Sequence, residues 1–422
     1  MKKICLLTML LSFSLYMMAQ VNYPIAAAKV QRYYNQQQAD SFYAMFGPAM
    51  KAALPPDQTR AMLSQLHSQL GELLQLTPSG GDATYQSWKA AFTKGALTMI
   101  LALNKDNQLE GFRFIPYQEK AIVEKDPDNF VLHAVGADIV GTLTMPVSNA
   151  KVPVVLLIAG SGPTDRNCNS KLGINTNAFK MLAEALQADG IACLRYDKRG
   201  VGASVTSQQQ SEVTFDIMVD DASGMLKMLK EDQRFSTVVV AGHSEGSLIG
   251  MLAAQREKAD RYISIAGSGE RIDLIIERQL NAQSPPLAQK AKLLFDSLRQ
   301  GQTIHNTEPT LQTMFYPGIQ PYIASWMKYT PSEEIKKLKI PKLIIQGTED
   351  IQVSINDAHM LQQAGAPALL KEINGMNHVL KNPAGGKSLN DPTYRDPTQP
   401  LNLELVKDIE EFVKGVIVYR QQ

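Results

Sequence analysis

The chain has very little cysteine, with 3 residues among 422. Cys5 lies in an apolar run at the N-terminus, which leaves only Cys168 and Cys193 in the rest of the chain. Two cysteines do not make the disulfide framework of a small extracellular scaffold. Neither lies in a Cys/His spacing typical of zinc proteins, so the sequence predicts no metal site.

An excess of charge of either sign is also missing. The chain carries 42 Lys and Arg against 41 Asp and Glu, which gives a net charge of +1. Proteins that bind nucleic acid or anionic membranes usually have a clear basic excess. We therefore expect no nucleic acid partner and no anionic membrane partner.

Long hydrophobic runs are absent apart from one at the N-terminus. A basic segment at residues 1–3 precedes an apolar run from Cys5 to Met18, and Ala19 follows it. This pattern predicts a secretory signal peptide over residues 1–19 and a secreted or periplasmic protein. The run is short for a membrane span. We expect no stable span after cleavage; an uncleaved N-terminal anchor is the alternative.

Residues 20–116 differ in pattern from the rest and predict a small α+β domain. Apolar residues at near-helical spacing indicate two helical segments, and the alternating segments after them indicate a short antiparallel sheet. A cluster of Thr, Pro, Ser and Gly at Thr77–Gly81 predicts a turn between the two parts. The predicted helices are Ile25–Met50 and Asp57–Leu74, and the predicted strands are Ala83–Trp88, Gly95–Asn104 and Gln108–Pro116.

Residues 117–422 predict an α/β domain. Continuous apolar strands alternate with amphipathic helices, which is typical of a mostly parallel sheet with helices on both faces. The segment at about 268–335 interrupts this alternation and is too long for a plain loop. We expect it to form a helical lid. The predicted strands include Pro153–Ile158, Ile191–Tyr196, Thr237–Ala241, Tyr262–Ala266, Lys342–Gln346 and Leu369–Ile373.

The most informative motif is Gly242-His243-Ser244-Glu245-Gly246. It follows a β-branched strand and precedes a helical stretch, which is the context of a nucleophile elbow. The two glycines allow strand and helix to approach closely. A serine at such a turn is exposed at the strand tip, where an imidazole can activate it. Ser244 is therefore the candidate nucleophile.

An acid and a histidine follow in the order that a nucleophile elbow requires, Ser, then acid, then His. Asp350 lies just beyond the predicted strand Lys342–Gln346 and is the candidate acid, with Glu349 as the alternative. Of the six histidines, His378 lies in a loop after the last predicted strand, where it can reach both groups. We expect His378 to be the general base. His243, beside the serine, is expected to point elsewhere.

Two backbone N–H groups are expected to stabilise an oxyanion. One belongs to Glu245, the residue after the nucleophile. The other is expected in the glycine-containing turn Gly160-Ser161-Gly162 after the first central strand, and we assign it to Ser161. Asp165 and Arg166 lie just past this turn; we expect them to support structure, with substrate contact as the alternative.

With these motifs in order, together with Asp197-Lys198-Arg199-Gly200, the second domain resembles the α/β-hydrolase superfamily. It is most similar to exported bacterial carboxylesterases and serine-aminopeptidase-like hydrolases, some of which carry a small N-terminal α+β domain. The resemblance implies a serine hydrolase that cleaves small-molecule carboxylic esters through a Ser-His-Asp triad and an acyl-enzyme. It implies no cofactor.

Two other functions remain open from the sequence. An aminopeptidase or amidase could use the same triad, with Glu270, Asp273 or Glu277 of the lid binding a free amine. A non-catalytic exported binding protein would use the N-terminal domain instead. The sequence predicts neither the acyl and alcohol specificity nor the oligomeric state.

Overall fold

The computed structural model describes residues 22–81, 85–116, 129–171, 173–305, 309–383 and 388–416. The predicted signal peptide, residues 1–19, lies outside the described residues. The chain divides into two compact units, Met1–Lys120 and Ala121–Gln422. No helix in the described part of the chain is both long and apolar enough to span a membrane.

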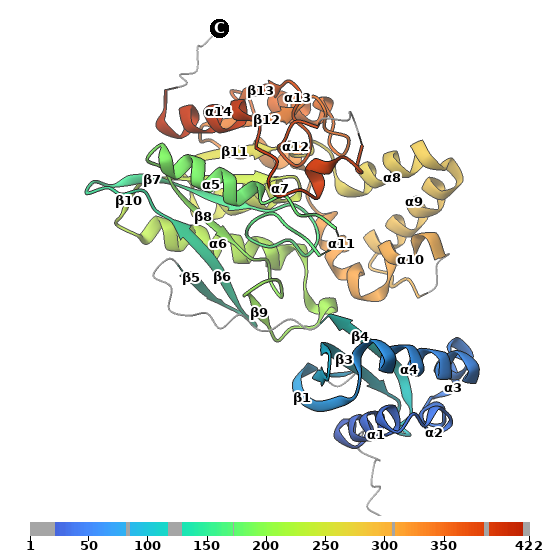
Figure 1. The fold of residues 1–422 in the computed structure, drawn as a ribbon. Coiled ribbons are helices and arrows are strands. Elements are labelled where there is room, and N and C mark those ends of the chain that lie inside the picture. Colours follow the sequence, from blue (N-terminus) through green and yellow to red (C-terminus); the bar gives the residue numbers. More distant parts are fainter. Residues whose placement is uncertain are drawn as a thin grey trace, which may run out of the picture. The chain divides into compact units, whose positions relative to one another are not determined.

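The first unit has helices followed by a four-stranded antiparallel meander (Figure 1). Its core packs aromatic side chains of the helices, such as Tyr34 and Phe42, against one face of this sheet. The helices are α1 (Tyr23–Asn35), α2 (Ala39–Ala44), α3 (Pro48–Ala53) and α4 (Pro56–Leu70), and the strands are β1 (Leu73–Gly81), β2 (Gln86–Phe92), β3 (Gly95–Leu103) and β4 (Leu109–Pro116).

Several predicted boundaries in this unit are wrong. The segment Ile25–Met50 does not form one helix, because Gln37 adopts a left-handed conformation with φ 52° and the chain turns there. The second helix ends before Gly71, whose φ is +75°, so Leu73 and Leu74 begin strand β1. The predicted turn Thr77–Gly81 is part of the same strand. Of the predicted strand Ala83–Trp88, Ala83 lies outside the described residues and β2 continues to Phe92.

The second unit is built on a sheet in which the neighbouring strands β8, β7, β10, β11, β12 and β13 run parallel. The antiparallel strands β6 and β5, with the short β9, complete one edge. The strands are β5 (Asn129–Ala134), β6 (Ala137–Thr144), β7 (Val152–Ile158), β8 (Ala192–Tyr196), β9 (Val205–Thr206), β10 (Phe235–His243), β11 (Arg261–Ile265), β12 (Lys342–Gly347) and β13 (Leu369–Ile373).

Both faces of this sheet are covered by helices, as the continuous apolar strands predict. Along β7, Val154 and Leu156 pack into one core and Val155 and Leu157 into the other, and all four are at most 1% exposed. The first core also contains side chains of α6 (Phe215–Glu231), α7 (Glu245–Glu257) and α13 (Ile355–Ala364). The second contains side chains of α5 (Ala178–Ala188) and α14 (Leu403–Lys414).

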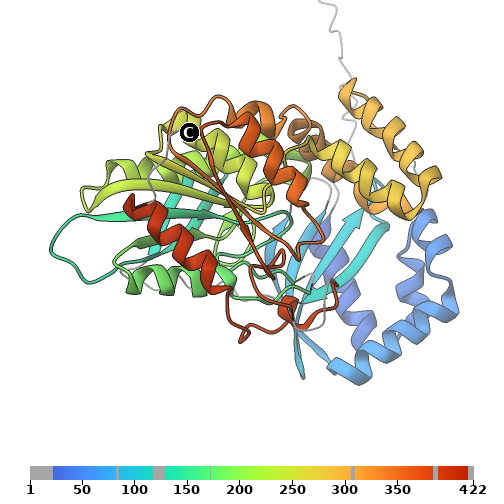
Figure 2. The ribbon, with the colours of Figure 1, turned by 90° about the horizontal axis from the view of Figure 1, so that it is seen from above.

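The segment between β11 and β12 forms a helical lid. Its first two helices pair as a hairpin, drawn in yellow and orange in Figures 1 and 2, and their buried apolar side chains form a core of their own with those of α10 and α11. The lid helices are α8 (Ile272–Gln283), α9 (Pro285–Arg299), α10 (Pro309–Phe315), α11 (Gln320–Trp326) and α12 (Pro331–Ile335).

Candidate active site

Ser244 lies at a sharp turn between β10 and α7. Its backbone has φ 55° and ψ −121°, a conformation that side-chain-bearing residues rarely adopt. The flanking glycines are required by space, because a Cβ at Gly242 would lie 2.0 Å from the carbonyl oxygen of Gly246. A Cβ at Gly246 would lie 2.2 Å from the carbonyl oxygen of Ile158. The strand and the helix can cross at this distance only with glycine at both positions, which holds the serine at the tip of the turn.

His378 and Asp350 are paired beside this turn. The His378 Nδ1 lies 2.8 Å from the Asp350 Oδ2, and the two side chains are 7% and 0% exposed. The Asp350 Oδ1 accepts hydrogen bonds from the backbone N–H groups of Gln352 and Val353, at 2.8 and 3.0 Å. The structure pairs His378 with Asp350 and forms no such bond to the alternative acid, Glu349, among the described residues.

The ionisation of Asp350 fixes the tautomer of His378. Burial alone would raise the pKa of this carboxyl, but the charge of His378, its hydrogen bond and the N–H groups of Val353 and Gln352 together hold the pKa below its usual range. A carboxylate can only accept a hydrogen bond, so His378 carries its proton on Nδ1. Its Nε2 is then left with the lone pair that a general base needs.

The Ser244 hydroxyl forms no hydrogen bond to His378 within the described residues. The ring of His243, the residue before Ser244, lies 4.8 Å from the ring of His378. Hydrogen bonds between a nucleophile and its base are often long without a substrate. The structure therefore pairs His378 with Asp350, and the contact between Ser244 and His378 stays a prediction.

His243 has a positioning role that the sequence did not reveal. Burial, followed by the charge of His378, lowers the pKa of His243 to about 3, so its ring is neutral. The His243 Nε2 lies 2.8 Å from the carbonyl oxygen of His378 and donates to it, while the buried Nδ1 has no partner in the described part of the chain. The elbow thus holds the loop that carries His378 through one hydrogen bond and one ring contact. Its place beside Ser244 was the only signal for this in the sequence.

The two backbone N–H groups that we expect to stabilise an oxyanion belong to Glu245 and Ser161. Glu245 is the first residue of α7, where N–H groups have no acceptor within the helix and the helix dipole favours negative charge. Neither its N–H nor that of Ser161 has a backbone acceptor among the described residues. Gly160 packs directly on Ser244, since a Cβ there would lie 3.1 Å from the Cβ of Ser244.

The turn that carries Ser161 is anchored from behind. The Arg166 backbone N–H and its Nη2 both donate to the Asp197 carboxylate, at 2.8 and 2.6 Å. Asp197 is only 3% exposed and also accepts from the N–H of Ala203. Arg166 therefore supports the turn, as expected.

A cavity of about 290 Å³ opens beside Ser244. Its polar end contains Ser161, Ser244 and Glu245, and its walls are mostly apolar side chains of the lid and of α7. The apolar lining comprises Leu248, Ile272, Ile275, Ile276, Trp326, Pro331 and Val353, and the remaining polar lining comprises Ser268, Glu270, Gln279 and Gln352.

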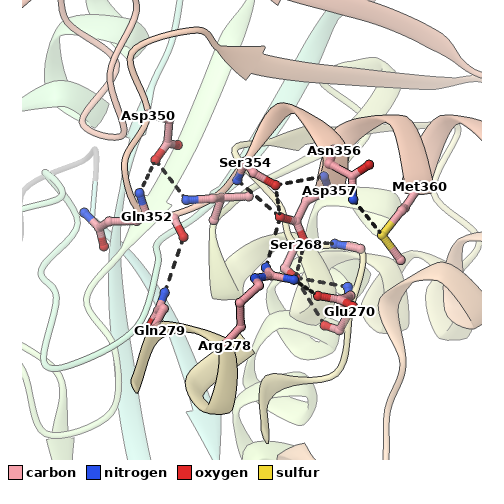
Figure 3. Close-up of polar contacts among 12 residues, drawn as sticks. Ser268, Glu270, Arg278, Gln279, Asp350, Gln352, Ser354, Asn356, Asp357 and Met360 are labelled. Atoms are coloured by element: carbon pink, nitrogen blue, oxygen red, sulfur yellow. Dashed lines mark hydrogen bonds and ion pairs between the residues drawn. The ribbon is translucent and has the colours of Figure 1, made fainter. Parts of the chain in front are cut away.

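The lid helix α8 is tied to the loop that carries Asp350 (Figure 3). Arg278 pairs with Glu270 and reaches the buried Asp357 of α13 at 3.5 Å. Gln279 donates to the carbonyl oxygen of Gln352 at 3.4 Å. These contacts fix the wall of the cavity relative to the acid. No group of His, Cys, Asp and Glu side chains in the described residues could hold a metal ion.

Comparisons with known proteins agree with this architecture. Residues 172–313 match the family described as "Serine aminopeptidase, S33", and residues 27–112 match "Protein of unknown function (DUF3887)". The chain is 28% identical over 297 residues to "Esterase EstD" of Thermotoga maritima. The matched region covers 68% of this chain and 67% of that protein.

The solved structures to which the chain is similar include the following two. Est1E from Butyrivibrio proteoclasticus, bound to ferulic acid, is 18% identical, covers 68% of this chain and 97% of its own, and has a TM-score of 0.44. A thermophilic esterase from Thermogutta terrifontis is 16% identical. The match covers 69% of this chain and 99% of the esterase, with a TM-score of 0.43.

Three observations on the second unit indicate the same fold. They are the parallel sheet, the serine elbow at the end of β10 and the family match. The second unit has the α/β-hydrolase fold, and the chain is similar to esterases and to serine-aminopeptidase-like hydrolases, with a small α+β domain before the hydrolase unit.

Proposed function

We propose that this protein is a serine hydrolase that cleaves small, uncharged carboxylic esters through an acyl-enzyme. The observation that carries the proposal is the strained elbow of Ser244, which sets the hydroxyl on the wall of a cavity beside the N–H groups of Ser161 and Glu245. The proposal is also supported by the pairing of His378 with Asp350, whose Nδ1 and Oδ2 atoms lie 2.8 Å apart.

The proposed chemistry follows the usual two steps of acyl transfer. The Ser244 oxygen attacks the ester carbonyl carbon while the His378 Nε2 takes the hydroxyl proton. The N–H groups of Ser161 and Glu245 bind the oxyanion, and His378 then gives its proton to the departing alkoxide. In the second step His378 deprotonates water, which attacks the acyl-enzyme and releases the acid and free Ser244. Asp350 stabilises the imidazolium in both steps.

The size and charge of the cavity indicate the substrate class. Its volume of about 290 Å³ is at the lower end for small-molecule sites. The two carboxylates in its wall are already paired, Glu245 with Lys198 and Glu270 with Arg278. A short, neutral acyl group fits such a site.

The same charges weigh against an amine-binding site, which the family description would favour. Asp273 is fully buried and paired with Arg271 and Arg299. Glu277 does not line the cavity, and Glu270 is the only one of the three predicted lid acids that does. The comparison of an amino-acid p-nitroanilide with p-nitrophenyl acetate separates the two functions. An aminopeptidase would turn over the anilide faster.

The test of the proposed function is Ser244→Ala, assayed with p-nitrophenyl acetate. We expect hydrolysis to fall by at least about three decades, to the residual rate that binding and the oxyanion site give without a nucleophile. Ser297→Ala, which changes a half-buried serine of α9 that does not line the cavity, is the matched control and should keep the parent rate. If the Ser244→Ala protein hydrolyses the ester as fast as the control, the proposed function is wrong.

A further inference from the structure

Glu245 carries a buried side chain that the proposed chemistry does not use. Its Oε1 accepts two hydrogen bonds, from the Lys198 Nζ at 3.1 Å and from the Tyr322 hydroxyl at 2.6 Å. The side chains of Glu245 and Lys198 are 2% and 8% exposed. We call these three residues the Glu245 cluster. They come from the start of α7, the loop after β8 and the lid helix α11.

A buried ion pair at this position needs a reason beyond stability. Taking two charges out of water costs several kcal/mol per ion, and a hydrophobic replacement is often as stable. The carboxylate belongs to the residue whose own N–H is the proposed oxyanion donor. Contacts that hold this side chain in place limit the movement of the residue that carries the N–H.

We propose that Lys198 and Tyr322 are positioning residues for the oxyanion site, acting through the Glu245 carboxylate. This inference rests on the proposed function. Lys198 fixes the carboxylate from the sheet, and Tyr322 fixes it from the lid. The lid therefore contributes to the rate of the chemical step as well as to the shape of the cavity.

The lid helix has anchors that do not involve Glu245. The ring of Trp326 stacks on Phe215 with centroids 5.4 Å apart, and the Ser325 hydroxyl accepts from the backbone N–H of Phe215 at 2.8 Å. Just after α11, the Tyr329 hydroxyl donates to Asp216 at 2.5 Å. Loss of the Tyr322 hydroxyl alone should therefore leave α11 in place.

The chain offers a matched pair of variants. Tyr322→Phe removes a hydroxyl that donates to the Glu245 carboxylate, and Tyr329→Phe removes one that donates to the Asp216 carboxylate. Removing an oxyanion donor outright costs about 10²–10³ in kcat. Because Tyr322→Phe only loosens a donor, we expect kcat to fall by about tenfold, with KM unchanged. Tyr329→Phe should change neither constant.

The inhibition constant of a transition-state analogue tests the positioning role, because a merely structural role of Tyr322 would leave it unchanged. The probe is 1,1,1-trifluoro-2-butanone, whose adduct with a serine places an oxyanion in the site. We expect Tyr322→Phe to raise its inhibition constant by the same factor that it lowers kcat/KM. Lys198→Arg keeps the charge but not the single Nζ contact, and it should show the same correlation if Tyr322→Phe does not fold.

Three results would overturn the inference. They are a Tyr322→Phe protein with unchanged kcat and inhibition constant, an equal loss in Tyr329→Phe, or a rise in KM alone. Each is distinct from failure of the proposed function, which shows as undiminished activity in Ser244→Ala.

Discussion

Replacing Asp350 with Asn should abolish the general base while leaving the fold nearly intact. The Asp350 Oδ1 accepts from two backbone N–H groups, so an asparagine would keep its oxygen there and turn its NH₂ toward His378. The Nδ1 of His378 must then accept instead of donate. Its proton moves to Nε2, the atom that has to receive the proton of Ser244.

The magnitude follows from this change of tautomer. In a serine protease the equivalent substitution lowers kcat by about 10⁴, which corresponds to about 5 kcal/mol of transition-state stabilisation. We expect a loss of 10³–10⁴ in Asp350→Asn, since the same N–H groups hold the side chain. KM should stay within about threefold, because Asp350 does not line the cavity.

The assay is steady-state hydrolysis of p-nitrophenyl acetate, with Glu349→Gln as the matched control. That variant removes the same charge one residue away and has no contact with His378 in the described structure. It should keep kcat within twofold. Equal losses in the two variants, or an active Asp350→Asn protein, would refute the assigned role of the carboxylate.

The remaining predictions concern the elbow and the cavity. His243 has its pKa lowered to about 3 by burial, against about 6.5 unfolded, so its neutral form stabilises the fold fully above pH 6.5 and this contribution is lost as pH falls. The unfolding free energy should fall by about 2 kcal/mol between pH 7 and pH 5. In urea titrations, the unfolding free energy of His243→Gln should depend less on pH than that of the parent protein. Gly246→Ala should lower stability by at least about 2 kcal/mol in the same titrations, because its Cβ would meet the Ile158 carbonyl oxygen; a stable variant would contradict the reported crossing. Ile275→Trp should fill the cavity and raise the preference for acetate over hexanoate esters by about tenfold or more, and an unchanged preference would show that acyl groups bind elsewhere.

The elements of the hydrolase unit could be predicted from the sequence because each is fixed by a local pattern. The apolar runs of β7 and β10 are buried on both faces, and Ala178–Ala188 forms α5 with the predicted bounds. Ser244, Asp350 and His378 each follow a predicted strand, and the apolar pattern of the strands locates these strand ends. The structure then pairs the acid and histidine that this order selected.

The N-terminal unit shows where such patterns fail. Leu73 and Leu74 continue the helical spacing of α4, yet the left-handed Gly71 ends the helix and pairing with β2 draws them into a strand. Thr77–Gly81 has the composition of a turn, but cross-strand hydrogen bonds with irregular register keep it in β1. Tertiary contacts outweigh local preference in both cases.

The contacts of the positioning residues could not be predicted from the sequence, where only the place of His243 beside Ser244 gives a signal. Tyr322 is 77 residues from Glu245, and only the fold brings the lid helix to the elbow. Lys198 lies in the Asp197-Lys198-Arg199-Gly200 motif, which by itself does not indicate a contact with Glu245. His243 had been excluded as a base, which agrees with its neutral ring, but its bond to His378 depends on a contact 135 residues apart.

The central claim is that Ser244 forms a covalent bond to the substrate. The most direct test is to treat the purified protein with a fluorophosphonate and locate the adduct by peptide mass spectrometry. We predict one adduct, on Ser244, formed in step with the loss of esterase activity. A protein that still hydrolyses ester after complete reaction, or one that carries the label on another residue while losing activity, would contradict the mechanism.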